Sequence, residues 1–233
     1  MALPKINSSP KYEMKIPSTK ETVRFRPFLV REEKVLMIAM ESNENSQMLG
    51  AIVDTLDSCV EGGVNKDSLT TFDVEYMFTK LRAKSVGETS KVGIACQHCE
   101  EQNEVVINID ELHVEVAETD FMLELGDNIT LEMKWPTYST IVKMNPESNA
   151  TDQVFAVLRA SLSAVHTEEE RIDLKDESEK VIHESIESMD RSQFEKIQSF
   201  IEKMPNLSHD VKFTCTNCNE ENIVKLEGMQ SFF

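Results

Sequence analysis

The sequence predicts an α+β protein in which two distant parts of the chain share one metal-binding module. Three observations predict this fold class: apolar residues recur at helical spacing in the N-terminal third, residues 129–135 alternate with the period of a strand, and a Cys-x-x-Cys motif occurs twice. We expect a helical N-terminal layer and a four-cysteine zinc ribbon formed by two distant knuckles, with a β segment and a helical insert between the knuckles.

The first part of the chain divides into an arm and a mostly helical domain. Residues 1–22 contain three prolines among polar residues and are expected to form an extended basic arm. In the domain at residues 23–90, a strand-like segment precedes three predicted helices, at 31–41, 48–60 and 71–85. The helix at 31–41 is apolar nearly all round, which predicts that it is well buried.

The middle of the chain changes pattern twice. Residues 111–136 are expected to form a β extension that stops at Pro136. Residues 137–208 return to helical spacing and predict an acidic helical insert, whose first helix includes Val154 and continues to Val165. The acidic side chains of this insert favour a solvated face over a dedicated acidic site, since charged side chains are normally exposed.

The most informative pattern is an internal repeat. Residues 91–105 read KVGIACQHCEEQNEV and residues 210–224 read DVKFTCTNCNEENIV, at a constant offset of 119 residues. Both cysteines match, and so does Asn103 with Asn222. Each copy has the pattern of a strand, a Cys-x-x-Cys turn and a second strand. We therefore expect the ribbon module at residues 91–110 plus 209–228.

The four cysteines of the repeat are the predicted metal ligands: Cys96, Cys99, Cys215 and Cys218. Two residues between cysteines let a tight turn aim both sulfurs at one ion, and two such pairs complete a closed tetrahedral site for one structural zinc per chain. The alternatives are two separate hairpins with free thiols, or a redox pair, although neither motif lies in a βαβ context of the thioredoxin kind. The fifth cysteine, Cys59, lies on an apolar helical stripe and is interpreted as a core residue.

The composition of the chain argues against several classes of function. The chain has 42 acidic and 24 basic residues, for a formal net charge of −18, which argues against direct nucleic-acid binding because such binding rests on Lys and Arg. No apolar run is long enough for a membrane span and the N-terminus lacks a signal-peptide stretch, so we expect a cytoplasmic protein with reduced thiols. No nucleophile–base pair or Gly-rich phosphate loop is evident, so we expect that the protein is not an enzyme.

Two surfaces are candidates for partner binding. The basic arm on an acidic body suggests a partner or sister subunit of complementary charge, although a solvated terminus is the alternative. The apolar C-terminal tip at residues 229–233 contains Met229, Phe232 and Phe233. This tip is expected to dock either on its own body or on a partner.

Two stretches carry a family resemblance. The first is Phe25-Arg26-Pro27-Phe28 with the charged and apolar helix that follows, and the second runs from Phe72 to Glu88 and on to the first cysteine pair. Together they resemble the T-even-like phage baseplate hub protein family, which includes the baseplate hub subunit and the hub assembly catalyst.

The resemblance implies a protein that assembles the baseplate hub by protein–protein contacts inside the infected host, with other hub proteins or the tape-measure protein as partners. Arg26, Pro27, Phe28 and Arg82 are the residues we expect at such a contact. The local alternatives are that Arg26 bonds groups near the Pro27 turn and that Arg82 pairs with Glu88. The alternative functions are a permanent structural subunit of the baseplate hub and a zinc-ribbon regulator that binds host polymerase.

Overall fold

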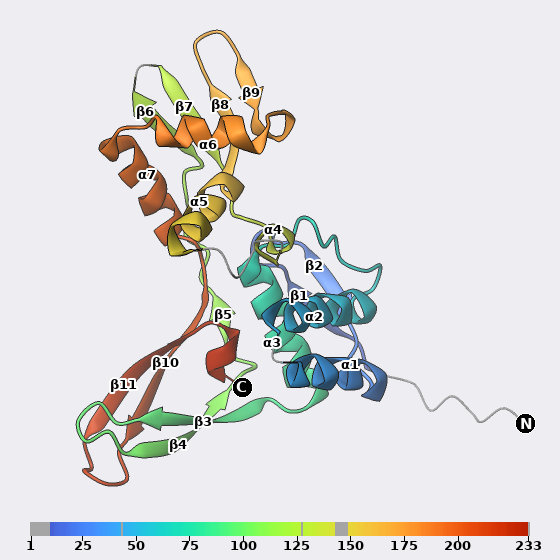
Figure 1. The fold of residues 1–233 in the computed structure, drawn as a ribbon. Coiled ribbons are helices and arrows are strands. Elements are labelled where there is room, and N and C mark those ends of the chain that lie inside the picture. Colours follow the sequence, from blue (N-terminus) through green and yellow to red (C-terminus); the bar gives the residue numbers. More distant parts are fainter. Residues whose placement is uncertain (1–9, 43, 127, 143–148, 233) are drawn as a thin grey trace, which may run out of the picture. The chain divides into compact units, whose positions relative to one another are not determined.

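The computed structural model describes residues 10–42, 44–126, 128–142 and 149–232 (Figure 1). It is a mixed α and β protein, and within these residues it has seven α-helices and four small antiparallel sheets. The chain divides into unit 1, residues 1–116 and 206–233, and unit 2, residues 117–205. Among the described residues, no helix has both the length and the apolar character needed to cross a membrane.

The N-terminal part of unit 1 is a hairpin followed by three helices. Strands β1 (Tyr12–Lys15) and β2 (Thr22–Phe25) pair, and helices α1 (Val30–Glu41), α2 (Asn45–Cys59) and α3 (Thr71–Ser85) follow. Helix α2 ends just before Gly62 and Gly63, which take positive φ angles of 84° and 77°. Helix α3 begins at a capping box, in which Thr70 and Asp73 each accept a backbone N–H.

The prediction that the helix at 31–41 is well buried is wrong. Five apolar residues of α1, which we call the α1 surface, are 48–79% exposed: Val30, Val35, Met37, Ile38 and Met40. Only Glu32, Leu36 and Ala39 of this helix are buried. The reason is that α1 packs mainly against α2, which covers only part of the helix and leaves these apolar side chains largely exposed.

Two long hairpins carry the cysteine motifs (Figure 1). Strands β3 (Thr89–Ala95) and β4 (Gln102–Asn108) form one, and strands β10 (Leu207–Thr214) and β11 (Glu221–Glu227) form the other. The short strand β5 (His113–Val114) pairs with the beginning of β10 and so ties the first half of unit 1 to the second. In Figure 1 the turns of the two hairpins lie side by side.

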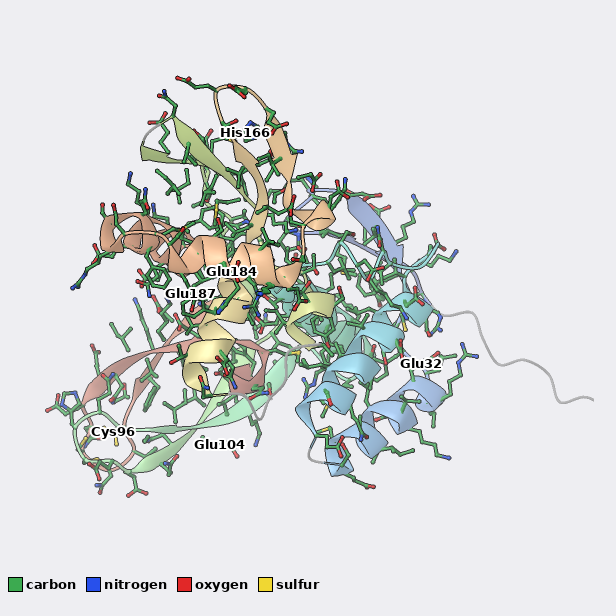
Figure 2. All side chains as sticks on the ribbon, turned by 45° about the horizontal axis from the view of Figure 1, so that its top comes forward. Glu32, Cys96, Glu104, His166, Glu184 and Glu187 are labelled. Carbon is green, nitrogen blue, oxygen red and sulfur yellow. The ribbon has the colours of Figure 1, made fainter. Side chains whose placement is uncertain are left out.

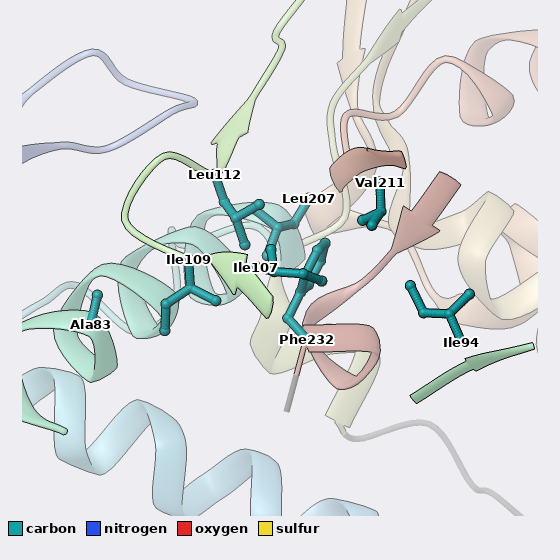
Figure 3. Packing of buried hydrophobic residues seen from close by; sticks show 8 residues of the cluster. All are labelled: Ala83, Ile94, Ile107, Ile109, Leu112, Leu207, Val211 and Phe232. Carbon is teal, nitrogen blue, oxygen red and sulfur yellow. The ribbon is translucent and has the colours of Figure 1, made fainter. Parts of the chain in front are cut away.

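The buried cluster in Figure 3 joins the two sequence segments of unit 1. Its members come from α3, both hairpins, the segment after β4 and the C-terminal 3₁₀ turn η2 (Met229–Phe232): Ala83, Ile94, Ile107, Ile109, Leu112, Leu207, Val211 and Phe232. Phe232 is completely buried, so in this structure the predicted apolar tip packs on its own body. Met229 is half-buried, and Phe233 lies outside the described residues.

Unit 2 consists of one antiparallel sheet with helices. The sheet order is β6 (Met122–Gly126), β7 (Ile129–Met133), β8 (Leu162–His166) and β9 (Arg171–Asp173). The helices are α4 (Tyr138–Val142), α5 (Ala150–Ala160), the 3₁₀ turn η1 (Leu174–Asp176), α6 (Glu179–Glu187) and α7 (Arg191–Glu202). Trp135 stacks on Phe200 with ring centroids 4.5 Å apart, in the core of this unit.

The prediction of a purely helical segment at 137–208 is therefore wrong over 162–173, where the chain forms β8 and β9. Helix α5 ends at Ala160, and Leu162 and Ala164 are then buried while Ser163 between them is half-buried. Leu162 and Val165 continue the helical spacing of Leu158 in the sequence, but in the structure both pair with β7 and belong to strand β8. Residues 143–148 of the predicted insert lie outside the described residues.

Candidate metal centre

The four predicted ligands meet at the turns of the two hairpins. The sulfurs of Cys96, Cys99, Cys215 and Cys218 all lie within 4.8 Å of one another. The Sγ atoms of Cys96 and Cys218 are 3.6 Å apart, and so are those of Cys99 and Cys215. All four cysteines are free thiols rather than disulfides. Figure 2 labels Cys96 at this end of the hairpins.

These distances fit a tetrahedral metal ion. A zinc–sulfur bond of about 2.3 Å places the sulfurs of a tetrahedral site about 3.8 Å apart. The two sulfur pairs at 3.6 Å, each of which joins one hairpin to the other, are within a few tenths of an ångström of that value. The residues present therefore fit a closed site with four thiolate ligands, and a soft d¹⁰ ion such as Zn²⁺ suits this donor set.

The local backbone explains how one motif aims two sulfurs at one point. In the first turn the N–H of Cys96 donates to the carbonyl of Glu101 at 2.8 Å, and the N–H of Glu100 donates back to the carbonyl of Cys96 at 3.0 Å. Glu100 has a φ of 63°, which closes the turn tightly. The N–H of His98 points at the Cys96 sulfur, with a nitrogen–sulfur distance of 3.4 Å.

The second turn repeats this geometry 119 residues later. The N–H of Cys215 donates to Glu220 at 2.9 Å, and the N–H of Asn219 donates to the carbonyl of Cys215 at 3.1 Å. Asn219 has a φ of 59°, and the N–H of Asn217 lies 3.4 Å from the Cys215 sulfur. The sequence repeat is therefore a repeat of structure, and the two turns face each other with approximate two-fold symmetry.

Two asparagines link the turns, and sequence reasoning had not assigned them a role. The side-chain oxygen of Asn103 on β4 accepts the N–H of Thr216 in the opposite turn at 2.8 Å, and that of Asn222 on β11 accepts the N–H of Gln97 at 2.8 Å. The signal that could have found them was present, because Asn103 and Asn222 match in the repeat.

The surroundings of the sulfurs alter their acidity. The backbone N–H groups of Cys218 and Asn217 stabilise the Cys215 thiolate and, against the effect of burial, lower the pKa of Cys215 to about 6. At Cys218 the N–H of Glu220 lowers the pKa, but burial and the neighbouring sulfurs outweigh it and raise that pKa to about 12. Such a cluster holds protons that a metal ion must displace.

Cys59 lies apart from this centre. It is buried in α2, and desolvation raises the pKa of its thiol to about 11, as expected for a core residue rather than a reactive one.

The other predicted site residues lie elsewhere in unit 1. Arg26 is half-buried and donates to the carbonyls of Pro27 and Ser58 and to the Glu32 carboxylate, so its guanidinium is used within the chain. The backbone N–H of Phe28 donates to Ser85 at 3.0 Å.

Arg82 does not contribute to the metal centre either. It is half-buried on α3, and burial lowers the pKa of its guanidinium. Glu88, the partner considered for Arg82, pairs with Lys84 at 2.6 Å.

Comparison with known proteins adds one match. A model of the family described as T4 bacteriophage base plate protein matches residues 9–233. Searches of the curated proteins and of the solved structures found no match.

Proposed function

The chain belongs to the T4 bacteriophage base plate protein family, and on this premise we propose that it is a baseplate hub assembly protein that acts by binding other baseplate proteins. Its partners on this proposal are other hub proteins or the tape-measure protein, which it meets in the host cytoplasm during assembly. The family match over almost the whole chain is the observation that carries the proposal.

We further propose that the four-cysteine cluster binds one structural zinc ion. Four protein thiolates leave no position for water or substrate, which supports a structural role and a non-enzymatic protein. Two ligands precede unit 2 in the sequence and two follow it. Zinc at this place would join the two sequence segments of unit 1 and hold both ends of the inserted unit.

The α1 surface supports a role in protein contacts. Its five apolar residues lie within three turns of one helix and are 48–79% exposed, and this density of exposed large apolar side chains is typical of a surface that binds a partner. We therefore place the main contact with a hub partner on α1, ahead of Arg26, whose donors are already used within the chain.

Co-purification with candidate partners tests this function. The wild-type protein is co-expressed with each hub and tape-measure protein, beside the double variant Met37→Lys with Ile38→Lys. Val181→Lys is the matched control, because Val181 is an exposed apolar residue of unit 2 at 49% exposure. We expect the double variant to weaken partner binding about tenfold or more and the control to bind like the wild type. Wild-type protein that binds none of these partners would contradict the proposal.

Mass spectrometry of purified particles then separates a transient assembly protein from a permanent subunit. Absence from mature particles supports a transient, chaperone-like role. Presence at a fixed copy number supports the alternative, a permanent structural subunit of the baseplate hub.

A further inference from the structure

The two asparagines that link the cysteine turns are buried and fully bonded. Asn103 and Asn222 are 4% and 1% exposed, and a buried amide is unfavourable unless its donors and its acceptor are satisfied. The oxygen of Asn103 accepts both the N–H and the hydroxyl of Thr216, at 2.8 and 3.0 Å. Its nitrogen donates to the carbonyl of Glu101 at 2.8 Å and lies 3.6 Å from the Cys215 sulfur.

Asn222 makes the corresponding backbone bonds in the other direction. Its oxygen accepts the N–H of Gln97 at 2.8 Å, and its nitrogen donates to the carbonyl of Glu220 at 3.0 Å. Each asparagine therefore reaches from its own hairpin to the residue that follows the first cysteine of the other turn.

From this geometry we propose that Asn103 and Asn222 are the positioning residues of the metal site, and that they hold the two turns in ligand geometry before the metal binds. This inference rests on the proposed zinc site. The two crossed bonds fix the backbone at Gln97 and Thr216, one residue from a ligand sulfur in each turn. A pair of such bonds restrains both the separation and the relative rotation of the hairpins.

The consequence is a preorganised site. The β5–β10 pairing and the buried cluster already bring the two hairpins together. The crossed bonds add a restraint at the turns themselves, so that the metal ion does not have to supply it. With the crossed bonds in place, the metal ion binds four sulfurs that already lie close together. The amide nitrogen of Asn103, 3.6 Å from the Cys215 sulfur, also offsets part of the negative charge of a four-thiolate site. Partners that orient metal ligands typically change metal affinity by about 10- to 100-fold.

Zinc affinity of the full-length protein is the first test. Apparent zinc dissociation constants are measured by competition with a chromophoric chelator for the wild type, Asn103→Ala and Asn222→Ala. We expect each variant to bind zinc about 10- to 100-fold more weakly than the wild type. Asn108→Ala is the control, because Asn108 ends the same strand β4 but its side-chain nitrogen donates to Glu111, and we expect unchanged affinity.

Amide exchange in the metal-free wild type is the second test, and it needs no variant to fold. We expect the N–H groups of Gln97 and Thr216 to be protected from hydrogen exchange before zinc is added, since both donate to asparagine oxygens. Free exchange of these two amides without metal, or alanine variants that bind zinc like the wild type, would overturn the inference alone. Wild-type protein that binds no zinc would instead overturn the metal centre itself, and this inference with it.

Discussion

Glu32 is a buried carboxylate whose removal should destabilise unit 1 in a pH-dependent way. It is 6% exposed on α1 (labelled in Figure 2) and accepts from Arg26 at 2.9 Å, from Arg31 at 2.7 Å and from the N–H of Leu29 at 2.8 Å. Burial raises its pKa, but these hydrogen bonds outweigh burial and bring the pKa down to about 2. The perturbation is Glu32→Gln, which keeps the shape of the side chain and removes its charge.

The magnitude follows from the pKa of Glu32. A drop from 4.5 to about 2 corresponds to roughly 3 kcal/mol of stabilisation, at about 1.4 kcal/mol per pKa unit. Because the Arg31 side chain is 72% exposed and its pairing is screened by water, we expect Glu32→Gln to cost about 2 kcal/mol at pH 7. The folded-state pKa lies below the unfolded one. The stabilisation is therefore fully present above pH 5 and is lost as the pH falls towards 2.

The effect of Glu32→Gln has to be measured on the stability of unit 1 separately from that of unit 2. The only tryptophan, Trp135, lies in unit 2, so its fluorescence serves as the control. Hydrogen exchange of peptides from β2 and α2 gives the opening free energy of unit 1 in the wild type and in Glu32→Gln, at pH 7 and near pH 3. We expect the difference between the two proteins to shrink at the lower pH. An equal difference at both pH values would refute the assignment of the effect to the Glu32 charge.

Three further predictions concern other parts of the molecule. Phe232→Ala should destabilise unit 1 by about 3 to 5 kcal/mol, measured by urea unfolding with far-ultraviolet circular dichroism, and should leave the fluorescence transition of Trp135 unchanged. Glu132→Gln should lower the free energy of unfolding of its unit by less than Glu32→Gln lowers that of unit 1, measured by hydrogen exchange. Hydrogen bonds from Arg171 also lower the pKa of Glu132 to about 2, but this pair is more exposed to water. Apparent zinc affinity should fall as the pH is lowered from 8 to 6, because protons compete for the thiolates, and an affinity that does not change with pH would argue against thiolate ligation.

The cysteine cluster could be predicted because the geometry of each Cys-x-x-Cys turn depends on nearby residues. The Cys-x-x-Cys spacing and the strand pattern around it determine each turn, and four similar ligands suggest that the two turns meet. The role of Asn103 and Asn222 could not be read in the same way. The repeat showed that they match, but their bonds exist only once the turns face each other across an approximate two-fold axis.

Elements whose burial or secondary structure depends on residues distant in sequence were predicted less well. Helix α3 was expected at residues 71–85 and lies there, because its capping residues and apolar positions are local signals. Helix α1 was expected to be buried, but the apolar residues of a helix do not indicate how many of its sides other elements will cover. Leu162 and Val165 continued the helical spacing of Leu158, and it is the pairing of β8 with its neighbouring strands that places them in a sheet.

Metal content per chain, measured on protein purified without chelator, shows whether the four cysteines bind zinc. Cys215→Ser is the matched variant, because it removes one sulfur and changes little else. We expect one zinc ion per wild-type chain, and in Cys215→Ser both loss of that zinc and faster hydrogen exchange in β10 and β11. Wild-type protein without metal, or Cys215→Ser with a full complement of tightly bound zinc, would contradict the proposed zinc site.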